Sequence, residues 1–366
     1  MSGTLVVTGA GGFLGWHVRV LAHALQMPEP VIVGRDDFRD PNRLVGKLNG
    51  VDRVLHLAGV NRGAPQEVTA GNIEPAQALA LAVRQCPTPP KTVVFANSIQ
   101  AGNGSPYGDS KAAAADILVQ ATQWTGSTFA DLRLPNLFGE HGRPHYNSVV
   151  ATFCRLLADG AVPQVHEDRD LELLHATDAA ALLLGPGGPW DAQPVRRTVK
   201  QLAERLHRFA TCYRTGEIPD LASRFDVRLF NTYRSYCFPG HYPLPLEGHA
   251  DDRGELIEAV KVRGGGGQTF CSTTRPGAIR GEHYHLAKVE RFMVLRGEAD
   301  ICLRRVLHND VVRFRVSGTE PVVVDMPTMW AHNITNIGDG ELLTLFWANQ
   351  TFNSARPDTY PEKVSP

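Results

Sequence analysis

The stretch that most restricts the fold of this chain runs from Gly277 to Gly297 and has the spacing G-x5-H-x-H-x4-E-x6-G. His283 and His285 are separated by one residue, and side chains two apart on a β-strand project from the same face. Glu290 begins the next apolar segment, and His332 lies in a second β-rich stretch. Three imidazoles and one carboxylate suit Zn, Fe, Mn or Ni. The stretch therefore predicts one small strand pair that carries a divalent metal. Zinc is the ion that we expect, and Fe, Mn and Ni are the alternatives.

This spacing resembles the first sequence motif of the cupin barrels, and every fixed position of that motif is matched. The second cupin motif is matched in part, because Pro327, His332 and Asn336 stand at its positions while Pro321 and Met329 replace its two glycines. The resemblance implies an all-β barrel with the four side chains above as metal ligands. A metal-free barrel, in which the histidines form a hydrogen-bonded patch, is the alternative.

The length and composition of the chain bound its organisation. At 366 residues it is too long for one ordinary core, which predicts two domains. A net charge of −1 with mixed signs favours neither nucleic acid nor an acidic membrane surface as a partner. The six cysteines are scattered without a C-x-x-C pair, which is typical of reduced thiols. With no signal-peptide pattern and no apolar run near the ~20 residues that span a bilayer, we expect a soluble cytoplasmic protein.

The first residues of the chain predict a dinucleotide-binding unit. A short apolar strand, Thr4–Thr8, runs into a glycine-rich turn and then into a helix. Gly9 permits the tight turn, Gly12 lets a pyrophosphate approach the backbone, and Gly15 lets the helix pack closely on the strand. The phosphates are expected at the helix N-terminus, where free N–H groups and the dipole favour an anion. The expected cofactor contacts in this stretch are Gly9, Gly12, Phe13, Leu14 and Gly15.

The residues after the next two predicted strands concern the choice of cofactor. Arg35 follows the second strand, where an acidic residue would bind the ribose 2′-hydroxyl of NAD and an arginine suits the 2′-phosphate of NADP. Arg35 therefore favours NADPH, although Asp36 is adjacent to it and a solvated surface charge is the alternative. The third strand and its cofactor-side loop span Asp52–Gly59. Two residues of this loop are expected beside the cofactor, Leu57 and Ala58.

Ser98, Tyr107 and Lys111 predict a site of proton transfer. Ser98 lies just past the carboxyl end of the fourth strand, Lys91–Asn97, where ligands bind in doubly wound sheets. Tyr107 and Lys111 are four residues apart and share one face of a helix. We expect Tyr107 to donate a proton to a ketone oxygen, Ser98 to hold that oxygen, and Lys111 to contact the cofactor and lower the phenol pKa from its usual ~10. An ordinary helix surface is the alternative.

The motifs T-G-A-G-G-F-L-G, H-L-A-G, N-S-I-Q and Y-G-D-S-K occur here in the order of the extended short-chain dehydrogenase/reductases that act on nucleotide sugars. The N-terminal part resembles that family, which implies a Rossmann-type doubly wound parallel sheet. The interval between Ser98 and Tyr107 is shorter than in other members. Three residues are expected to contact the sugar nucleotide, with a turn or cap role as the equal alternative: Asn136, His145 and Asn147.

A Pro/Gly-rich linker at 238–245 predicts the domain boundary. We expect the NAD(P)-binding reductase domain to span residues 1–243 and the cupin domain, which would also pair two chains into a homodimer, to span 244–366. Pro357–Pro366 is expected to be a polar tail.

The whole chain resembles the CapF-like family of bifunctional capsular-polysaccharide enzymes. Among the stretches that carry this resemblance are L-P-N-L-F-G, H-Y-H-L-A-K-V-E-R-F and P-D-T-Y. The resemblance implies that the cupin epimerises C3 of a UDP-4-keto-6-deoxy-N-acetylhexosamine and that the reductase then reduces the C4 ketone with NADPH. The implied product is UDP-2-acetamido-2,6-dideoxy-L-talose, a precursor of N-acetyl-L-fucosamine.

The chemistry agrees with that order of steps. A C3 proton is acidic only while C4 is a ketone, because the carbanion is then delocalised as an enolate. Epimerisation needs a base, an acid and a group that stabilises the enolate oxygen, and a metal can supply the last as a Lewis acid. Since metal-bound histidines cannot be the base, Tyr284, Lys288 and His308 are the nearest alternatives. The resembling motif favours Lys288, and a surface lysine is its alternative reading.

Two other functions stay open. The chain can be a single-reaction NADPH-dependent 4-ketoreductase in which the barrel only holds a dimer together. It can also be a regulator that binds NADPH without turnover, although a sensor has no need of the proton donor in the set Ser98, Tyr107 and Lys111.

Overall fold

The structure, a computed structural model, describes residues 3–185 and 193–365. It divides into two compact units. The N-terminal unit consists of Met1–Phe138, Gly142–Ser148 and Asp170–Arg197. The C-terminal unit consists of Gly139–His141, Val149–Arg169 and Thr198–Pro366.

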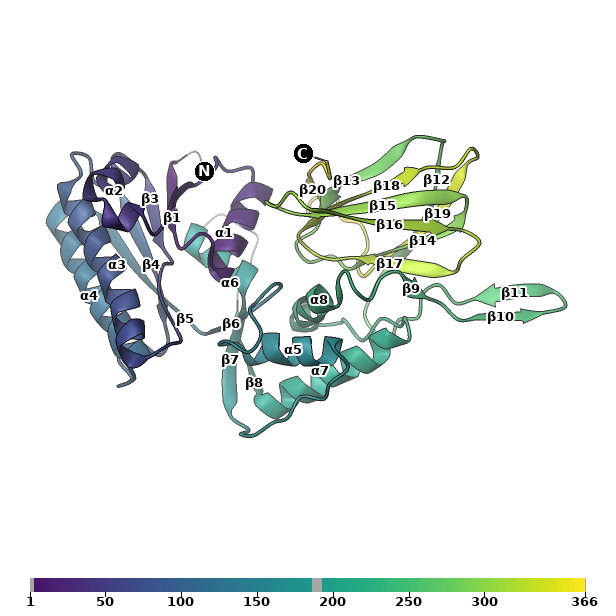
Figure 1. The fold of residues 1–366 in the computed structure, drawn as a ribbon, viewed down its shortest axis with the longest axis horizontal. Coiled ribbons are helices and arrows are strands. Elements are labelled where there is room, and N and C mark those ends of the chain that lie inside the picture. The colour runs from purple at the N-terminus through teal and green to yellow at the C-terminus, as the bar shows by residue number, and fades with distance from the viewer. Residues whose placement is uncertain (1–2, 186–192, 366) are drawn as a thin grey trace. The chain divides into compact units, whose positions relative to one another are not determined.

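A five-stranded parallel sheet forms the middle of the N-terminal unit, in the order β2-β1-β3-β4-β5 (Figure 1). Its strands are apolar runs, and β1 is buried along its whole length, because helices cover both faces. The strand order changes direction between β1 and β3, so ligands are expected at the carboxyl ends of those two strands. The strands are β1 (Leu5–Thr8), β2 (Val31–Val33), β3 (Arg53–His56), β4 (Thr92–Ser98) and β5 (Thr128–Leu134).

Helices pack on the two faces of this sheet, α1 with α6 on one and α2, α3 and α4 on the other (Figure 1). They are α1 (Phe13–Ala24), α2 (Pro41–Leu48), α3 (Pro65–Gln85), α4 (Pro106–Thr125) and α6 (Ala176–Leu184), with the short 3-10 helix η1 at Asp37–Arg39. A small sheet follows, made of β6 (Asn136–Phe138), β7 (Asp170–His175) and β8 (Val195–Thr198).

The start of α4 is set by local sequence. The Ser105 hydroxyl accepts a backbone N–H of the first turn, and Pro106 occupies the first helical position, where its missing N–H costs nothing. Tyr107 therefore lies in the first turn and Lys111 one turn later, where its ammonium reaches back to β4.

Two antiparallel sheets of five strands each form most of the C-terminal unit (Figure 1). One has the order β12-β19-β14-β17-β9 and the other β16-β15-β18-β13-β20. Buried apolar side chains of both sheets, among them Phe292, Ile301 and Leu342, make the core between them. The strands are β9 (Leu244–Pro245), β12 (Gln268–Thr274), β13 (Ile279–Tyr284), β14 (Glu290–Arg296), β15 (Glu298–Arg305), β16 (Val311–Ser317), β17 (Val322–Met326), β18 (Trp330–Asn336), β19 (Leu342–Ala348) and β20 (Tyr360–Pro361).

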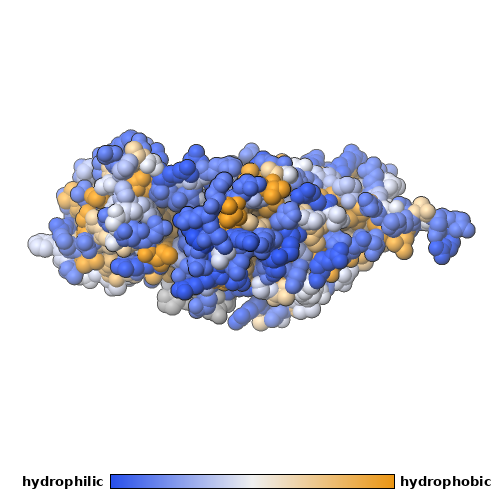
Figure 2. All heavy atoms as spheres, turned by 90° about the horizontal axis from the view of Figure 1, so that it is seen from below, coloured by the Kyte–Doolittle hydropathy of each residue, from blue (hydrophilic) through white to orange (hydrophobic). Residues whose placement is uncertain are grey.

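Three helices and a hairpin complete the C-terminal unit. The helices α5 (Val149–Ala158), α7 (Val199–Arg214) and α8 (Arg224–Cys237) pack on one another. The hairpin of β10 (Gly248–Asp251) and β11 (Gly254–Ile257) is exposed almost throughout. None of the described helices combines the length and apolar character that a bilayer crossing needs. The face in Figure 2 is largely hydrophilic, with apolar side chains scattered over it.

The predicted fold class, a Rossmann-type α/β part followed by an all-β part, is confirmed. Strand pairs of the described residues do not join the two C-terminal sheets into a closed barrel. Helices α7 and α8 group with these sheets because Tyr213 bonds Asp325 and Arg228 bonds the Leu286 carbonyl. The predicted domain boundary between residues 243 and 244 stays a prediction.

Two local predictions are wrong. The segments that carry His283 and Glu290 do not pair, because β13 and β14 belong to different sheets. The expected polar tail at residues 357–366 is in part packed: β20 pairs with β13, and Val364 is buried, while Pro366 lies outside the described residues. Both errors concern contacts between segments that are distant in the chain, and the local sequence pattern does not specify such contacts.

Candidate active site and metal centre

The glycine turn lies at the point where the strand order of the parallel sheet reverses. Gly9 has φ +68°, and a Cβ there would lie 2.7 Å from the backbone nitrogen of Ala58. The Thr8 hydroxyl accepts the N–H groups of Leu57 and Ala58, at 3.1 Å each, and so fixes the loop after β3 beside the turn. Gly12 caps α1 and is exposed, so the free N–H groups of the helix face outward.

The remaining residues of the predicted turn follow in the first turn of α1. Phe13 and Leu14 are half-buried and Gly15 is buried. The structure thus gathers the residues predicted for the cofactor after β1 and β3, and their contact with a cofactor stays a prediction.

A methyl group at Gly15 is expected to disrupt this turn. Its Cβ would collide with the carbonyl oxygen of Gly9 and lie 2.7 Å from the Cα of Ala10, both of them backbone atoms that cannot rotate away. Gly15→Ala should therefore lower the urea midpoint of unfolding and weaken NADPH binding, measured by fluorescence titration. Gly11→Ala is the matched control for the urea midpoint, since its Cβ would meet no described atom within 4 Å. Equal urea midpoints for the two variants would contradict the prediction.

The carboxyl end of β2 holds an acidic residue that the sequence reasoning missed. Arg35 is exposed directly after β2, as expected. Asp37 is buried, accepts the N–H of Gly34 at 2.7 Å, and forms ion pairs with Arg43 and Lys47. Burial raises the pKa of this carboxyl, but its hydrogen bonds and ion pairs outweigh burial and hold the pKa below the usual value. The Asp37 carboxylate is thus already paired with two cations, and the predicted preference for NADPH still depends on Arg35.

The predicted proton-transfer residues meet between β4 and α4. Ser98 ends β4 and is 8% exposed. The Lys111 ammonium donates to the Ala96 carbonyl at 2.6 Å and lies 3.9 Å from the centre of the Phe95 ring. Tyr107 is half-buried and hydrogen-bonds Ser98. Ser98 and Tyr107 therefore meet across β4 and α4, and Lys111, one turn further along α4, reaches the same strand.

The direction of the Tyr107 pKa shift is opposite to the predicted one. Burial raises the pKa of the phenol, and the hydrogen bond with Ser98 offsets part of the rise. Burial also lowers the pKa of Lys111 to about 7, against a smaller upward effect of the Asp131 carboxylate. A phenol with a raised pKa keeps its proton at neutral pH, which is the form that a proton donor needs.

The three residues predicted for the sugar nucleotide have different surroundings. The Asn136 amide donates to the Glu172 carbonyl at 3.1 Å and so bridges β6 and β7. His145 and Asn147 are exposed in the segment before α5, and the His145 carbonyl accepts a hydrogen bond from Arg62. Contact of all three with a sugar stays a prediction.

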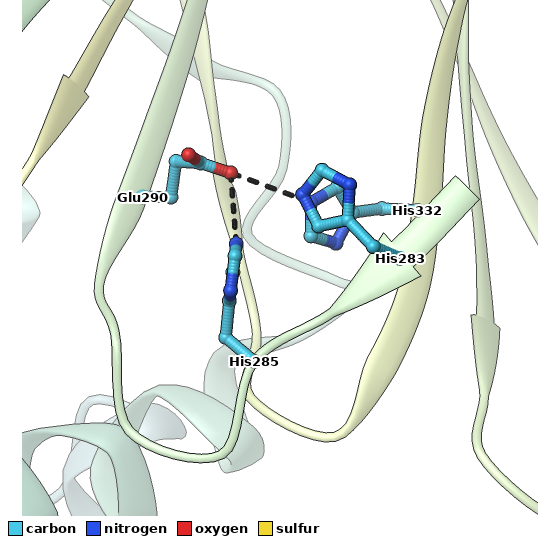
Figure 3. Close-up of side chains that lie close together, drawn as sticks. All are labelled: His283, His285, Glu290 and His332. Atoms are coloured by element: carbon cyan, nitrogen blue, oxygen red, sulfur yellow. Dashed lines mark hydrogen bonds and ion pairs between the residues drawn. The ribbon is translucent and has the colours of Figure 1, made fainter. Parts of the chain in front are cut away.

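The four predicted metal ligands converge, with one ligand atom from each within 4.8 Å of all the others (Figure 3). His283 on β13 is paired directly with His332 on β18, and His285 follows the end of β13. Glu290 begins β14 in the other sheet, so the cluster bridges the two sheets. Its Oε2 lies 3.1 Å from Nε2 of His285 and 3.3 Å from Nε2 of His332.

A metal can bind a histidine only through a ring nitrogen that carries no hydrogen, so the positions of the hydrogens on His285 and His332 test whether a metal fits. The Nδ1 atoms of His285 and His332 face the carbonyl oxygens of Asp358 and Trp330, which can only accept, so each Nδ1 carries a hydrogen. Burial lowers the pKa of His332, which keeps that ring neutral. Its Nε2 is then an acceptor that lies 3.3 Å from the Glu290 carboxylate, which is also an acceptor.

The other two members of the cluster agree with this result. Burial lowers the pKa of His283 to about 3, so its ring is neutral as well. Although burial raises the pKa of Glu290, the neighbouring imidazoles of His285 and His332 hold that pKa well below the usual value, so the group is a carboxylate. The neutral rings of His283 and His332 and a buried carboxylate converge with His285, and a divalent metal fits this donor set.

A cavity of about 350 Å³ opens beside this cluster. Lys288 lines it, is 8% exposed, and donates to the Pro357 carbonyl at 2.9 Å and the Thr359 hydroxyl at 3.2 Å. The reading of Lys288 as a surface lysine is therefore wrong. Neither Tyr284, which is buried against the ring of Tyr360, nor His308, which is exposed after β15, lines the cavity. Other lining residues are Phe270, Arg280, Phe292 and Phe346.

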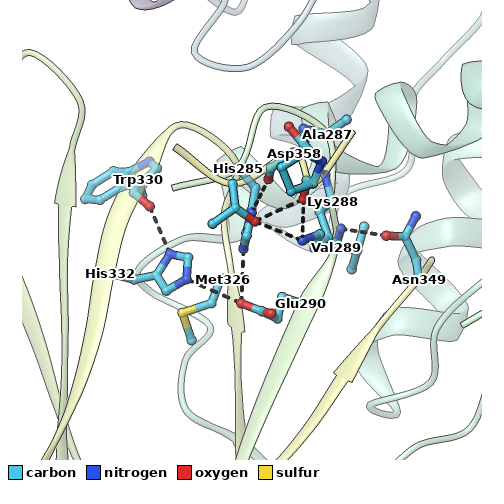
Figure 4. A network of polar contacts seen from close by, with 12 residues as sticks. His285, Ala287, Lys288, Val289, Glu290, Met326, Trp330, His332, Asn349 and Asp358 are labelled. Carbon is cyan, nitrogen blue, oxygen red and sulfur yellow. Dashed lines mark hydrogen bonds and ion pairs between the residues drawn. The ribbon is translucent and has the colours of Figure 1, made fainter. Parts of the chain in front are cut away.

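Asp358 is a further residue of this site that the sequence reasoning missed (Figure 4). Its side chain accepts the N–H groups of Leu286, Ala287 and Lys288. The signal available in the sequence was the stretch P-D-T-Y, which is part of the resemblance described above, but an aspartate 68 residues after Glu290 gives no local sign of a contact.

Comparisons with known proteins match both parts of the chain. The model of the NAD dependent epimerase/dehydratase family matches residues 5–184, and that of the polysaccharide biosynthesis C-terminal domain matches residues 249–360. A UDP-2-acetamido-2,6-beta-L-arabino-hexul-4-ose reductase of Pseudomonas aeruginosa is 31% identical over 97% of each chain.

Solved structures give the same picture. The capsular polysaccharide assembling protein CapF from Staphylococcus aureus is 30% identical, with a TM-score of 0.58, over 99% of this chain and 100% of that one. CapF with the inhibitor 3-isopropenyl-tropolone is 28% identical, with a TM-score of 0.53, over the same shares. A UDP-glucose 4-epimerase from Thermotoga maritima is 18% identical, with a TM-score of 0.50, over 57% of this chain and 82% of that one, and shares the fold alone.

Proposed function

Because the chain belongs to the family of that hexulose reductase and of the CapF-like capsular polysaccharide proteins, we propose that it converts a UDP-4-keto-6-deoxy-N-acetylhexosamine in two steps. The family is one of nucleotide-sugar enzymes of the reductase/epimerase type, which use a nicotinamide cofactor. In the proposal, the C-terminal unit inverts C3 and the N-terminal unit then reduces C4. The product is UDP-2-acetamido-2,6-dideoxy-L-talose.

In the reductive step, NADPH supplies a hydride when it is bound in the glycine turn. Tyr107 gives its proton to the oxygen at C4, and Ser98 holds that oxygen by a hydrogen bond. Lys111 would contact the bound cofactor, and Arg35 would hold its 2′-phosphate. The contact between Tyr107 and Ser98 supports this assignment, and the raised pKa keeps the phenol protonated at neutral pH while making it a weaker acid.

In the epimerisation step, the C3 proton leaves while C4 is still a ketone, because only then is the carbanion delocalised. Lys288 carries a proton to or from one face of the sugar ring. A divalent metal, when bound by His283, His285, Glu290 and His332, supplies positive charge for the enolate oxygen.

One observation supports the two-step proposal over a plain reductase. The buried Lys288 and three of the four metal-site side chains line one cavity of about 350 Å³. A barrel that serves only as a scaffold has no need to bury an amine and a carboxylate beside a cavity, since both are costly to desolvate.

Proton NMR in D2O without NADPH tests the proposal. The wild-type protein should incorporate deuterium at C3 of the 4-keto sugar. His332→Ala and Lys288→Met should lose this exchange, and removal of metal by a chelator should abolish it until zinc is added back. His308→Ala is the matched control, because this exposed histidine does not line the cavity, and it should exchange like wild type. No exchange in the wild type, with NADPH still consumed when added, would leave a single-reaction 4-ketoreductase.

The proposal also includes the remaining expectations from the sequence. The chain would act as a homodimer that pairs through the C-terminal sheets, and it would work in the cytoplasm, which suits its free cysteines. Sedimentation of the purified protein measures the first of these.

A further inference from the structure

The loop of residues 286–289 joins two of the metal-site side chains and carries a third functional group. It runs from His285, after one sheet, to Glu290, at the start of a strand in the other sheet. Lys288 lies within it. Any movement of this loop therefore changes the distance between two proposed metal ligands and the position of the proposed proton carrier together.

Helix α8 holds the carbonyl side of this loop. Arg228 donates to the carbonyl of Leu286 at 2.6 Å, and Asn231 donates to the carbonyl of Ala287 at 2.7 Å. Both donors are buried, at 2% and 1% exposure. Buried hydrogen bonds of this kind restrict movement of the loop, because a break would leave polar groups unpaired.

Asp358 holds the amide side of the same loop. Its carboxylate accepts the N–H groups of Leu286 at 3.0 Å, Ala287 at 2.9 Å and Lys288 at 2.7 Å (Figure 4). Hydrogen bonds to an ionised acceptor are about twice as strong as neutral ones. These three bonds replace the partners that the loop amides would otherwise find in a strand.

The segment around Asp358 also contacts the functional side chains themselves. The main-chain carbonyl of Asp358 accepts the Nδ1–H of His285, which turns Nε2 of that ring toward Glu290 in the metal site. The neighbouring Pro357 and Thr359 accept hydrogen bonds from the Lys288 ammonium.

The backbone of this segment is fixed in a conformation that is uncommon for a non-glycine residue. Asp358 has φ +43°. Directly after it, β20 pairs with β13, with Tyr360 opposite Tyr284 and Pro361 opposite His283. This strand pairing brings both the carboxylate and the carbonyl of Asp358 against the segment of residues 285–288.

We propose that Asp358 is a positioning residue that fixes the 286–289 loop, and with it the ring of His285 and the amine of Lys288, for metal binding and proton transfer. The inference rests on the proposed function for the roles of His285 and Lys288. The clamp itself, three amides on one carboxylate, can be measured without metal or substrate.

The main test compares Asp358→Asn with wild type, and with Asp310→Asn, an exposed aspartate in the turn before β16, as the matched control. Amide hydrogen exchange in the metal-free protein should be at least about tenfold faster at residues 286–288 in Asp358→Asn, because the charged acceptor is lost. Zinc affinity, measured by competition with a chromophoric chelator, should fall by about 10–100-fold. The control should match wild type in both measurements.

A second variant keeps the test valid if Asp358→Asn folds poorly. Thr359→Val removes one of the two hydrogen-bond acceptors of the Lys288 ammonium, the other being the Pro357 carbonyl, and leaves the loop amides bonded. It should slow C3 exchange at least about threefold while zinc affinity and amide exchange stay at wild-type values.

The outcomes separate the inference from the proposed function. Wild-type amide exchange and zinc affinity in Asp358→Asn would overturn the inference. If wild type binds no zinc but residues 286–288 exchange faster in Asp358→Asn, the clamp is supported and the metal assignment of the proposed function fails. If Asp358→Asn binds zinc as tightly as wild type while its amides at residues 286–288 exchange faster, Asp358 fixes the loop but not the ring of His285. The part of the inference that concerns metal binding is then overturned.

Discussion

Replacement of Tyr107 by phenylalanine is expected to lower the reductase kcat by about 10²- to 10⁴-fold, the range for the loss of a positioned proton donor. The variant keeps the ring but removes the hydroxyl that hydrogen-bonds Ser98. The oxygen at C4 would then have to take its proton from water. NADPH oxidation with a 4-keto sugar measures the effect at saturating substrate.

Two controls make this result specific. Tyr146→Phe removes a hydroxyl from a tyrosine that packs under Arg143 outside the Ser98 group, and it should leave kcat unchanged. Deuterium exchange at C3 should also persist in Tyr107→Phe, because that step is assigned to the C-terminal unit. A Tyr107→Phe protein with wild-type kcat would show that the proton reaches C4 by another route, and the assignment would fall.

Asp325→Ala is expected to destabilise the C-terminal unit by about 3–5 kcal/mol, the cost of removing one partner of a buried ion pair. Asp325 and Arg291 are both fully buried, and the carboxylate accepts Nε and Nη2 of the guanidinium at 2.7 and 2.9 Å. It also accepts the Tyr213 hydroxyl of α7 at 2.6 Å. Without the carboxylate, the Arg291 cation stays buried and, among the described residues, keeps only the carbonyl oxygens of Gly216 and Ala259 as hydrogen-bond partners.

Urea unfolding measures this loss, and Glu341→Gln provides the comparison. Glu341 pairs with Arg296 at 3.1 Å, but their side chains are 51% and 65% exposed, so the change should cost no more than about 1 kcal/mol. Unfolding should be followed by tryptophan fluorescence and by circular dichroism, since two compact units can unfold separately. A loss below about 1 kcal/mol for Asp325→Ala would mean that the buried pair barely offsets its own desolvation.

The parts of this protein that the sequence predicts well depend on short-range geometry. The turn after β1 needs glycine at Gly9 and Gly15, because side chains there would meet backbone. Four residues of spacing place Tyr107 and Lys111 on one face of α4. The cofactor turn and the proton-transfer group could therefore be read from the sequence, because each follows from the period of one element and the residues that begin it.

The tertiary structure decided what depends on contacts between distant segments. The spacing of His283 and His285 predicted a shared strand face, but Glu290 proved to lie on the other sheet, and no local period reports which sheet a strand joins. The burial of Lys288 depends on segments far along the chain.

The same division explains the pKa of Tyr107 and the role of Asp358. The prediction that Lys111 lowers the pKa of the Tyr107 phenol took account of charge alone. Burial instead sets the direction of the pKa shift, and the burial of a side chain depends on the packing of the whole unit. Asp358 meets the 286–289 loop because β20 pairs with β13. The chemical groups and their local spacing follow from the sequence alone. Which of these groups meet depends on the packing of distant strands. Their protonation states depend on it as well, because packing removes water from around each group.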